Sequence, residues 1–305
     1  MKYLKQHHGT VVPLITPVNA SGELDEAGLD RLVDAQIAGG VEGIFVLGTT
    51  GEAVNVPPKF RRRMIERAAQ RAGKRCLIYA GLGDLQPKEF GLANDYLNAG
   101  ADAVVVRPPV AVPVPEPELA GWFQKLLDQM QGPVMLYNIP MITRVSIPLD
   151  SLEKLIGHPR LIGFKDSENN PKRIEELLKR FGGKPDFSIF VGVGALMEKG
   201  LRLGADGIVP SVSNLIPKVC HNLCSSARKG DWAAASQHFA RMNTIAALYQ
   251  KDRTLAESLT VLKAAAHCLG LCSPNVLPPL LALKDSQITT LRGEMSRLHL
   301  LNGKA

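Results

Sequence analysis

Eight short apolar runs alternate with helix-like segments over the first two thirds of the chain. Continuous apolar runs are typical of parallel strands whose two faces are both buried. The expected strands span residues 10–17, 43–47, 76–80, 103–106, 133–137, 161–165, 187–191 and 205–209. Eight strand–helix units in roughly 200 residues predict an α/β protein with a (β/α)8 TIM barrel.

The expected helices follow these strands and then continue without further strands. Within the barrel they span residues 25–39, 58–72, 87–99, 118–130, 149–156, 171–181 and 195–203. After about Pro217 the pattern is purely helical, with segments at 218–227, 231–249, 255–269 and near 287–298. We therefore expect a barrel domain over residues 1–228 and a small C-terminal helical region over residues 229–305.

Charge and hydropathy narrow the class of protein. The 305 residues carry 36 Lys and Arg against 29 Asp and Glu, a net charge of +7, which favours small anionic substrates. The densest basic patch, residues 59–63, opens a helical pattern with no aromatic platform, so we expect a solvated helix face and no nucleic-acid partner. Neither a membrane span nor an apolar N-terminal leader is predicted, and a cytoplasmic location is expected.

The cysteines do not predict a disulfide framework or a metal site. Their number is five, and an odd number argues against paired disulfides. Two pairs, Cys220 with Cys224 and Cys268 with Cys272, are spaced four residues apart in helical patterns, each beside a histidine. This spacing is not that of a zinc ribbon, so we expect small buried side chains and no metal or cofactor.

One of the expected strands ends in a lysine, Lys165. A lysine at the last position of a buried strand loses hydration, which disfavours the ammonium form and lowers its pKa. A neutral amine there can attack a carbonyl carbon and form a Schiff base. Taken alone, the strand favours a lysine that merely begins a solvated loop, and the residues at the other strand ends change that weighting.

Other polar residues occupy the expected strand ends, where barrel enzymes carry their active sites. These positions hold Thr16, residues 48–52, Gly81, Arg107, Tyr137, Asn138, residues 165–167, Gly192 and residues 208–211. Together they supply an amine nucleophile, a phenol for proton transfer and backbone N–H groups for a carboxylate. Each alone has a structural explanation. Residues 48–52, called the threonine loop below, fit a tight turn, and Tyr137 fits a core aromatic residue.

Four motifs in this order carry a family resemblance over nearly the whole chain. They are Gly48-Thr49-Thr50-Gly51-Glu52, Tyr137-Asn138-Ile139-Pro140, Gly163-Phe164-Lys165-Asp166 and Gly204-Ala205-Asp206-Gly207-Ile208. The sequence resembles the dihydrodipicolinate synthase and N-acetylneuraminate lyase superfamily, which comprises Schiff-base-forming lyases and synthases on a (β/α)8 barrel.

The resemblance implies a role for each matched residue. Lys165 forms the imine with pyruvate or a related 2-oxo acid, and Tyr137 transfers protons. Thr49 and Thr50 bind the carboxylate, and Thr50 also hydrogen-bonds Tyr137. The backbones at Gly192 and Ile208 line the site. Relatives often contribute a tyrosine to a neighbouring subunit, so a homotetramer or homodimer is expected.

Departures from the family pattern bear on the substrate. No tyrosine stands in residues 106–110, and residues 193–196 lack the acidic pair of sialic acid lyases. Ile142 stands where the lysine-biosynthesis synthase keeps an arginine; Arg144, two residues later, either replaces that arginine or faces solvent. Ser167 and Ser211 offer hydroxyls to a polyhydroxy chain. By elimination we expect an aldolase or dehydratase of a 2-keto-3-deoxy sugar acid. The alternatives are dihydrodipicolinate-forming condensation and a non-catalytic 2-oxo-acid-binding protein.

Arg107 is the residue at the expected site that is most informative about the substrate. An arginine at a strand end presents a planar fork suited to a carboxylate or phosphate. Two interpretations are open: recognition of a second anionic group on the substrate, or an ion pair within the barrel rim, with Glu52 or Asp166 as partner.

Overall fold

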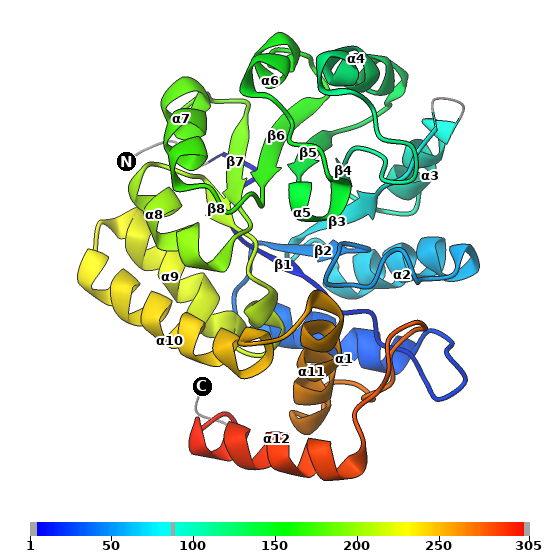
Figure 1. Cartoon of the computed structure of the whole chain (residues 1–305), viewed down its shortest axis with the longest axis vertical. Helices are drawn as coiled ribbons and strands as arrows, with labels where there is room; N and C mark the ends of the chain where they lie inside the picture. Colours follow the sequence, from blue (N-terminus) through cyan, green and yellow to red (C-terminus); the bar gives the residue numbers. More distant parts are fainter. Residues whose placement is uncertain (1–4, 87–88, 302–305) are drawn as a thin grey trace.

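Eight parallel strands close into a barrel in the computed structural model, which describes residues 5–86 and 89–301. The strands follow one another around the barrel in chain order, and β8 pairs with β1 (Figure 1). They are β1 (Gly9–Pro13), β2 (Gly43–Val46), β3 (Leu77–Leu82), β4 (Ala103–Val106), β5 (Val134–Asn138), β6 (Leu161–Asp166), β7 (Ser188–Val191) and β8 (Gly207–Ile208). The predicted (β/α)8 fold is confirmed.

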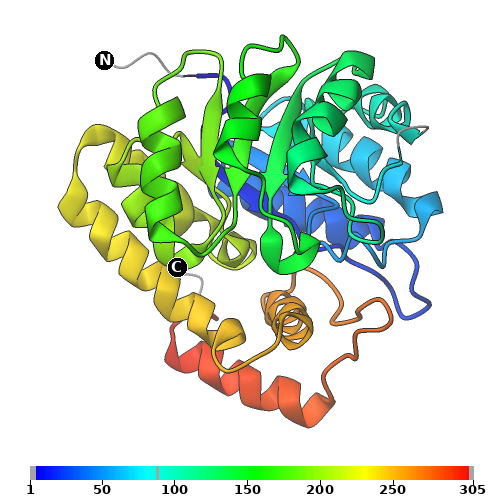
Figure 2. The same cartoon turned by 45° about the horizontal axis from the view of Figure 1, so that its top comes forward.

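Helices surround the barrel and then form the C-terminal region. The first group is α1 (Glu26–Ala38), α2 (Pro58–Ala72), α3 (Leu92–Asn98), α4 (Leu119–Gln129), α5 (Pro140–Thr143), α6 (Leu149–Leu155), α7 (Pro171–Phe181), α8 (Met197–Arg202) and α9 (Pro217–Lys229). The second is α10 (Trp232–Gln250), α11 (Leu255–Cys268) and α12 (Asp285–Arg297). Figures 1 and 2 show α10 to α12, coloured yellow to red, on one side of the barrel.

The structure differs from the sequence-based expectation at two helices and in the length of two strands, since β1 ends at Pro13 and β8 spans only Gly207–Ile208. The helix expected over residues 87–99 begins only at Leu92, after an irregular segment, and residues 87–88 lie outside the described part. The short helix α5, directly after β5, was not predicted, because four residues are too few to show a helical period. The expected domain division near residue 228 remains a proposal.

The apolar residues form two layers of core. The larger layer fills the space between the strands and the surrounding helices. The second fills the barrel interior, where inward-facing side chains of several strands meet; it contains Val11, Phe45, Tyr79, Ala103, Val105, Met135, Tyr137, Ile139, Phe190 and Val209. Inward and outward residues alternate along each strand, so a one-residue shift in register would exchange the two layers.

The basic helix α2 is paired with the acidic face of α1. Three arginines spaced four residues apart meet three carboxylates with the same spacing: Arg63 with Glu26, Arg67 with Asp30, and Arg71 with Asp34. Two parallel helices with matching four-residue repeats bring such pairs into register along their length. Within the basic patch at residues 59–63, Arg63 thus pairs with α1, Arg62 pairs with Glu66 inside α2, and Lys59 pairs with Glu23.

The cysteines are free thiols in buried positions. Burial raises the pKa of Cys224 and of Cys272 to about 12, which keeps both thiols protonated at neutral pH. Within residues 5–86 and 89–301, no three His, Cys, Asp or Glu side chains are grouped closely enough to hold a metal ion. No helix in these ranges is sufficiently long and apolar to cross a membrane.

Candidate active site

The side chain of Lys165 lies in the barrel interior near the C-terminal end of β6. It pairs in register with Tyr137 on β5 and Phe190 on β7. Its Nζ lies 3.8 Å from the ring centroid of Tyr137 and 4.9 Å from that of Phe45. Burial lowers the pKa of Lys165, and contact with Tyr137 opposes that shift. The lysine does not open a solvated loop, since only 5% of it is exposed.

The threonine loop after β2 presents unused backbone donors. Leu47 and Glu52 adopt left-handed φ angles of 57° and 56° and bracket the residues between them. The N–H of Glu52 donates to the carbonyl of Thr49, which closes a turn. The N–H groups of Thr49 and Thr50 donate no hydrogen bond in the described part of the chain. Such a turn with free amides is a setting that binds carboxylates.

Close packing holds this loop against the neighbouring strand. A Cβ atom at Gly81 would lie 2.1 Å from the carbonyl oxygen of Leu47, so only glycine allows β3 to approach the loop this closely. On the other side, the hydroxyl of Thr16 donates to the carbonyl of Gly51 at 2.6 Å. The strand ends predicted to converge are therefore in contact around the loop.

A cavity of about 260 Å³ opens beside the threonine loop and reaches Tyr137. Its walls come from the loop, from the ends of β3, β4 and β5, and from helix α11. The lining residues used below are Phe45, Thr49, Asn55, Arg61, Arg107, Tyr137, Leu255 and Leu259. Arg61 and the two leucines were not predicted as site residues, because a helical pattern does not show which face meets a cavity.

Arg107 forms a rim ion pair, but the expected partners were wrong. Its guanidinium contacts Asp84 at 2.7 Å, whereas Glu52 pairs with Lys263 and Asp166 with Arg173. Asp84 also accepts the N–H of Val110 at 2.7 Å. Because Arg107 additionally lines the cavity, the ion pair and a contact with substrate are compatible.

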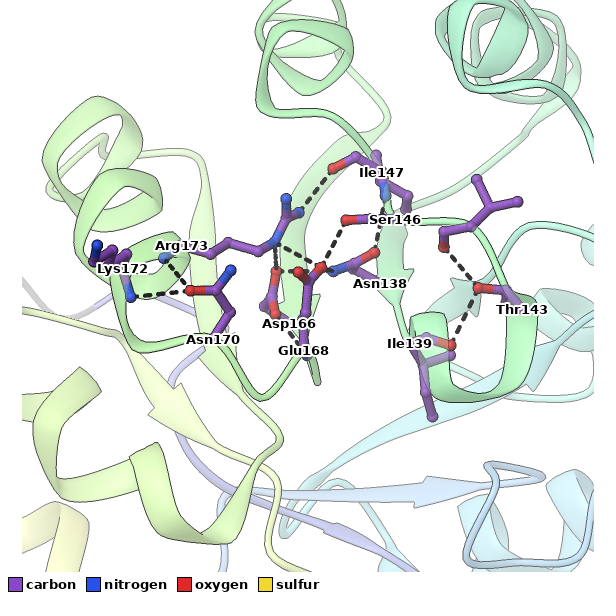
Figure 3. A network of polar contacts seen from close by, with 11 residues as sticks. Asn138, Ile139, Thr143, Ser146, Ile147, Asp166, Glu168, Asn170, Lys172 and Arg173 are labelled. Atoms are coloured by element: carbon purple, nitrogen blue, oxygen red, sulfur yellow. Dashed lines mark hydrogen bonds and ion pairs between the residues drawn. The ribbon is translucent and has the colours of Figure 1, made fainter.

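A polar network joins the ends of β5 and β6 (Figure 3). Arg173 contacts the buried carboxylate of Asp166 at 2.8 Å and donates to the carbonyl of Ile147 at 2.7 Å. Asn138 donates to Asp166 and to Glu168, at 3.1 Å in each case. Asn138 and Asp166 directly follow Tyr137 and Lys165 along their strands, so the network orients both strand ends.

The remaining predicted residues are placed as follows. A Cβ atom at Gly192 would lie 3.1 Å from Cε of Lys165 and 2.0 Å from the hydroxyl of Ser167, so these three residues are neighbours. Ile208 is buried, with its side chain in the outer core. The hydroxyl of Ser211 lies 2.7 Å from that of Tyr249 in α10, which engages it within the protein.

One contact implied by the family resemblance is absent. No hydrogen bond joins the hydroxyls of Thr50 and Tyr137, both of which belong to the described residues. The phenol ring of Tyr137 packs instead against Lys165 and, edge to face, against Phe45, with ring centroids 6.4 Å apart. The proton relay suggested by the resemblance is therefore not assembled in this arrangement.

Comparison with known proteins agrees with this architecture. The model of the Dihydrodipicolinate synthetase family matches residues 6–297. The chain belongs to this family. Members of the family are lyases, and the protein is accordingly a lyase.

Family relatives carry more than one activity name. A 4-hydroxy-tetrahydrodipicolinate synthase of Hydrogenobaculum sp. (strain Y04AAS1) is 29% identical, covering 96% of this chain and 99% of the relative. A relative from Escherichia coli (strain K12) named "Putative 2-dehydro-3-deoxy-D-gluconate aldolase YagE" is also 29% identical, covering 96% of this chain and 97% of the relative. The crystal structure of YagE in complex with pyruvate is 30% identical, with a TM-score of 0.88 and coverage of 96% and 99%.

Proposed function

We propose that Lys165 is the nucleophile of this lyase and forms a Schiff base with the keto carbon of a 2-oxo acid. The single observation that carries the proposal is the buried amine at the end of β6, with a depressed pKa and in contact with a phenol. The amine adds to the keto carbon and the resulting carbinolamine loses water. In aldol cleavage the iminium accepts the electron pair of the breaking Cα–Cβ bond, while the hydroxyl on Cβ loses its proton and becomes a carbonyl. Protonation and hydrolysis of the resulting enamine release the 2-oxo acid and the free lysine.

Tyr137 is the group placed to move protons in these steps. Its ring contacts Lys165 and lines the cavity, so its hydroxyl is within reach of a substrate bound as the imine. The carboxylate of the 2-oxo acid is proposed to bind the free N–H groups of Thr49 and Thr50. The lack of a side chain at Gly192 lets the Ser167 hydroxyl lie close to the lysine.

The proposed substrate class is the 2-keto-3-deoxy sugar acids, acted on by aldol cleavage or dehydration. The cavity of about 260 Å³ lies beside Tyr137. Asn55, Arg61 and Arg107 supply polar groups along the wall beyond Tyr137. The similarity to YagE supports the same class.

Condensation of pyruvate with aspartate semialdehyde is the second candidate. It is favoured by relatives of equal identity that are named as 4-hydroxy-tetrahydrodipicolinate synthases. A substrate panel separates the two: release of pyruvate from 2-keto-3-deoxy sugar acids, against consumption of pyruvate with the semialdehyde. If pyruvate is consumed with the semialdehyde and no sugar acid is turned over, the synthase proposal replaces the sugar-acid proposal.

The nucleophile itself is tested by reductive trapping. Borohydride added with pyruvate is expected to attach a three-carbon adduct to Lys165, identified by peptide mass mapping. Lys165→Ala should give no adduct and lose nearly all turnover, while its circular dichroism spectrum and melting temperature remain close to those of the parent protein. An adduct on another lysine, or none with any 2-oxo acid, would refute the assignment.

The assembly and location are also proposals. We propose that the chain acts as a homo-oligomer, a tetramer or a dimer, in the cytoplasm. Sedimentation velocity over a range of protein concentrations tests the assembly, and a monomer at all concentrations would contradict it. Fractionation of the producing cells tests the location.

A further inference from the structure

A buried ion pair joins the threonine loop to the C-terminal helical region. Glu52 closes the loop, and Lys263 lies within α11; Glu52 is 2% exposed and Lys263 0%. Nζ of Lys263 contacts Oε1 of Glu52 directly. Oε2 of Glu52 accepts the N–H of Leu277 at 2.9 Å, across 225 residues of sequence. One carboxylate therefore connects the loop to two segments of the C-terminal region.

This ion pair is poorly explained as a device for stability. Two charges lose their hydration when they are buried, and replacing such pairs by apolar residues is often neutral or stabilising. Within the described part of the chain, Lys263 forms an ion pair with no other acidic group. A buried pair with a single ionic contact fixes the relative position of two segments, which suggests that the position itself matters.

The loop that Glu52 closes needs such fixing. Two residues with side chains, Leu47 and Glu52, hold left-handed backbone conformations that such residues rarely adopt. Conformations of this kind persist only where the surroundings impose them. The backbone of Glu52 also accepts hydrogen bonds from Asn55 and Val56, at 2.7 and 3.2 Å. A shift of Glu52 would therefore move the whole turn that presents the free amides.

Helix α11 is well suited to impose this conformation. Nine of its 14 residues are buried, so the helix is firmly packed. It places Lys263 against Glu52 and, near its N-terminal end, Leu255 and Leu259 on the cavity wall. One rigid element thus contacts both the loop and the space where the substrate chain would lie.

We propose that the Glu52–Lys263 ion pair positions the N–H groups of Thr49 and Thr50 to receive the carboxylate of the 2-oxo acid. Glu52 and Lys263 are positioning residues, which act through the loop and take no part in bond breaking. The inference rests on the proposed function, because it assumes that the loop binds that carboxylate. It gives the C-terminal helical region a part in substrate binding that acts through the loop.

The test separates binding of pyruvate from the later chemistry. Reductive trapping of Lys165 is measured against pyruvate concentration for the parent protein and for Glu52→Gln, which removes the charge and keeps the shape. The half-saturating pyruvate concentration should rise about 10- to 100-fold, as expected for weakened charged hydrogen bonds. The trapping rate at saturation should stay within about threefold, because Lys165 and Tyr137 are unchanged.

Two further variants control for simple loss of stability. Asp206→Asn disrupts another partly buried ion pair, with Lys5, near the beginning of β8, and should leave half-saturation unchanged. Glu52→Gln combined with Lys263→Met leaves no unpaired buried charge; it should recover the melting temperature but not the parent half-saturation value. If Glu52→Gln does not fold, Glu52→Asp, with a shorter side chain that retains the charge, carries the same test.

The outcomes are distinct. Three results would overturn the positioning role. The half-saturating pyruvate concentration could stay within twofold of the parent value in folded Glu52→Gln, it could rise equally in Asp206→Asn, or it could return to the parent value in the double variant. Absence of any adduct in the parent protein would instead overturn the proposed function. An increase confined to the Glu52 and Lys263 variants supports the inference.

Discussion

Replacing Arg107 by alanine separates substrate recognition from rim structure. The guanidinium lies 2.7 Å from Asp84 and lines the cavity, so its removal affects both an ion pair and the wall. The Asp84 side chain is 38% exposed and can be rehydrated when its partner is lost. The ion pair itself therefore contributes about 0–1 kcal/mol, and the loss of packing around the Arg107 side chain, which is only 11% exposed, adds to the structural cost.

The cost to recognition is larger if the substrate carries a second anionic group. A charged hydrogen bond contributes about 1.5–3 kcal/mol, which corresponds to a rise of roughly 10- to 150-fold in KM for the longer substrate. The half-saturating concentration of pyruvate should change little, because the pyruvate carboxylate is proposed to bind the N–H groups of Thr49 and Thr50 and not Arg107. The assays are steady-state kinetics across the sugar-acid panel, reductive trapping with pyruvate, and thermal unfolding.

Asp84→Asn is the matched control for Arg107→Ala. It weakens the same ion pair from the other side and leaves the guanidinium at the cavity wall. If recognition is the role of Arg107, the control should keep KM within about threefold, since exposed ion pairs contribute little. Equal effects of the two substitutions, or unchanged kinetics of Arg107→Ala on every acid tested, would refute the reasoning.

Three further predictions concern proton transfer and pH. Tyr137→Phe keeps the ring against Lys165 and removes the hydroxyl, so kcat should fall by about 10²–10⁴-fold; an unchanged kcat would assign the proton to another group. Burial lowers the pKa of Lys165, so the rate of imine formation, measured by rapid quenching, should rise with pH with a midpoint below the ordinary lysine value of about 10.4; a midpoint there or above contradicts the assignment. Burial lowers the pKa of His7 from 6.5 to about 4, so between these values the unfolded chain binds a proton that the folded chain excludes. Denaturant unfolding should therefore show a loss of about 3 kcal/mol of stability as pH falls through that window, and His7→Gln, which can still meet the Tyr79 hydroxyl, should lose this dependence.

The sequence by itself determined the barrel, because the evidence for it is local. Each strand is a short apolar run and each helix has its own period, so the alternation can be counted without knowing any contact. The barrel then dictates that strand ends share one face, which places Thr49, Tyr137 and Lys165 near one another. The motifs around these residues also led to the family that the comparisons show.

Only the tertiary structure decided which polar groups are partners. The sequence offered Glu52 and Asp166 for Arg107, whereas the structure pairs Arg107 with Asp84. It likewise brings Lys263 to Glu52 across more than 200 residues and turns Leu255 toward the cavity. The period of a helix predicts that one face is buried, but which segment or cavity that face meets depends on how distant parts of the chain pack. Burial also decided that Lys165 is a desolvated amine, because loss of hydration depends on neighbours such as Phe45 from another strand.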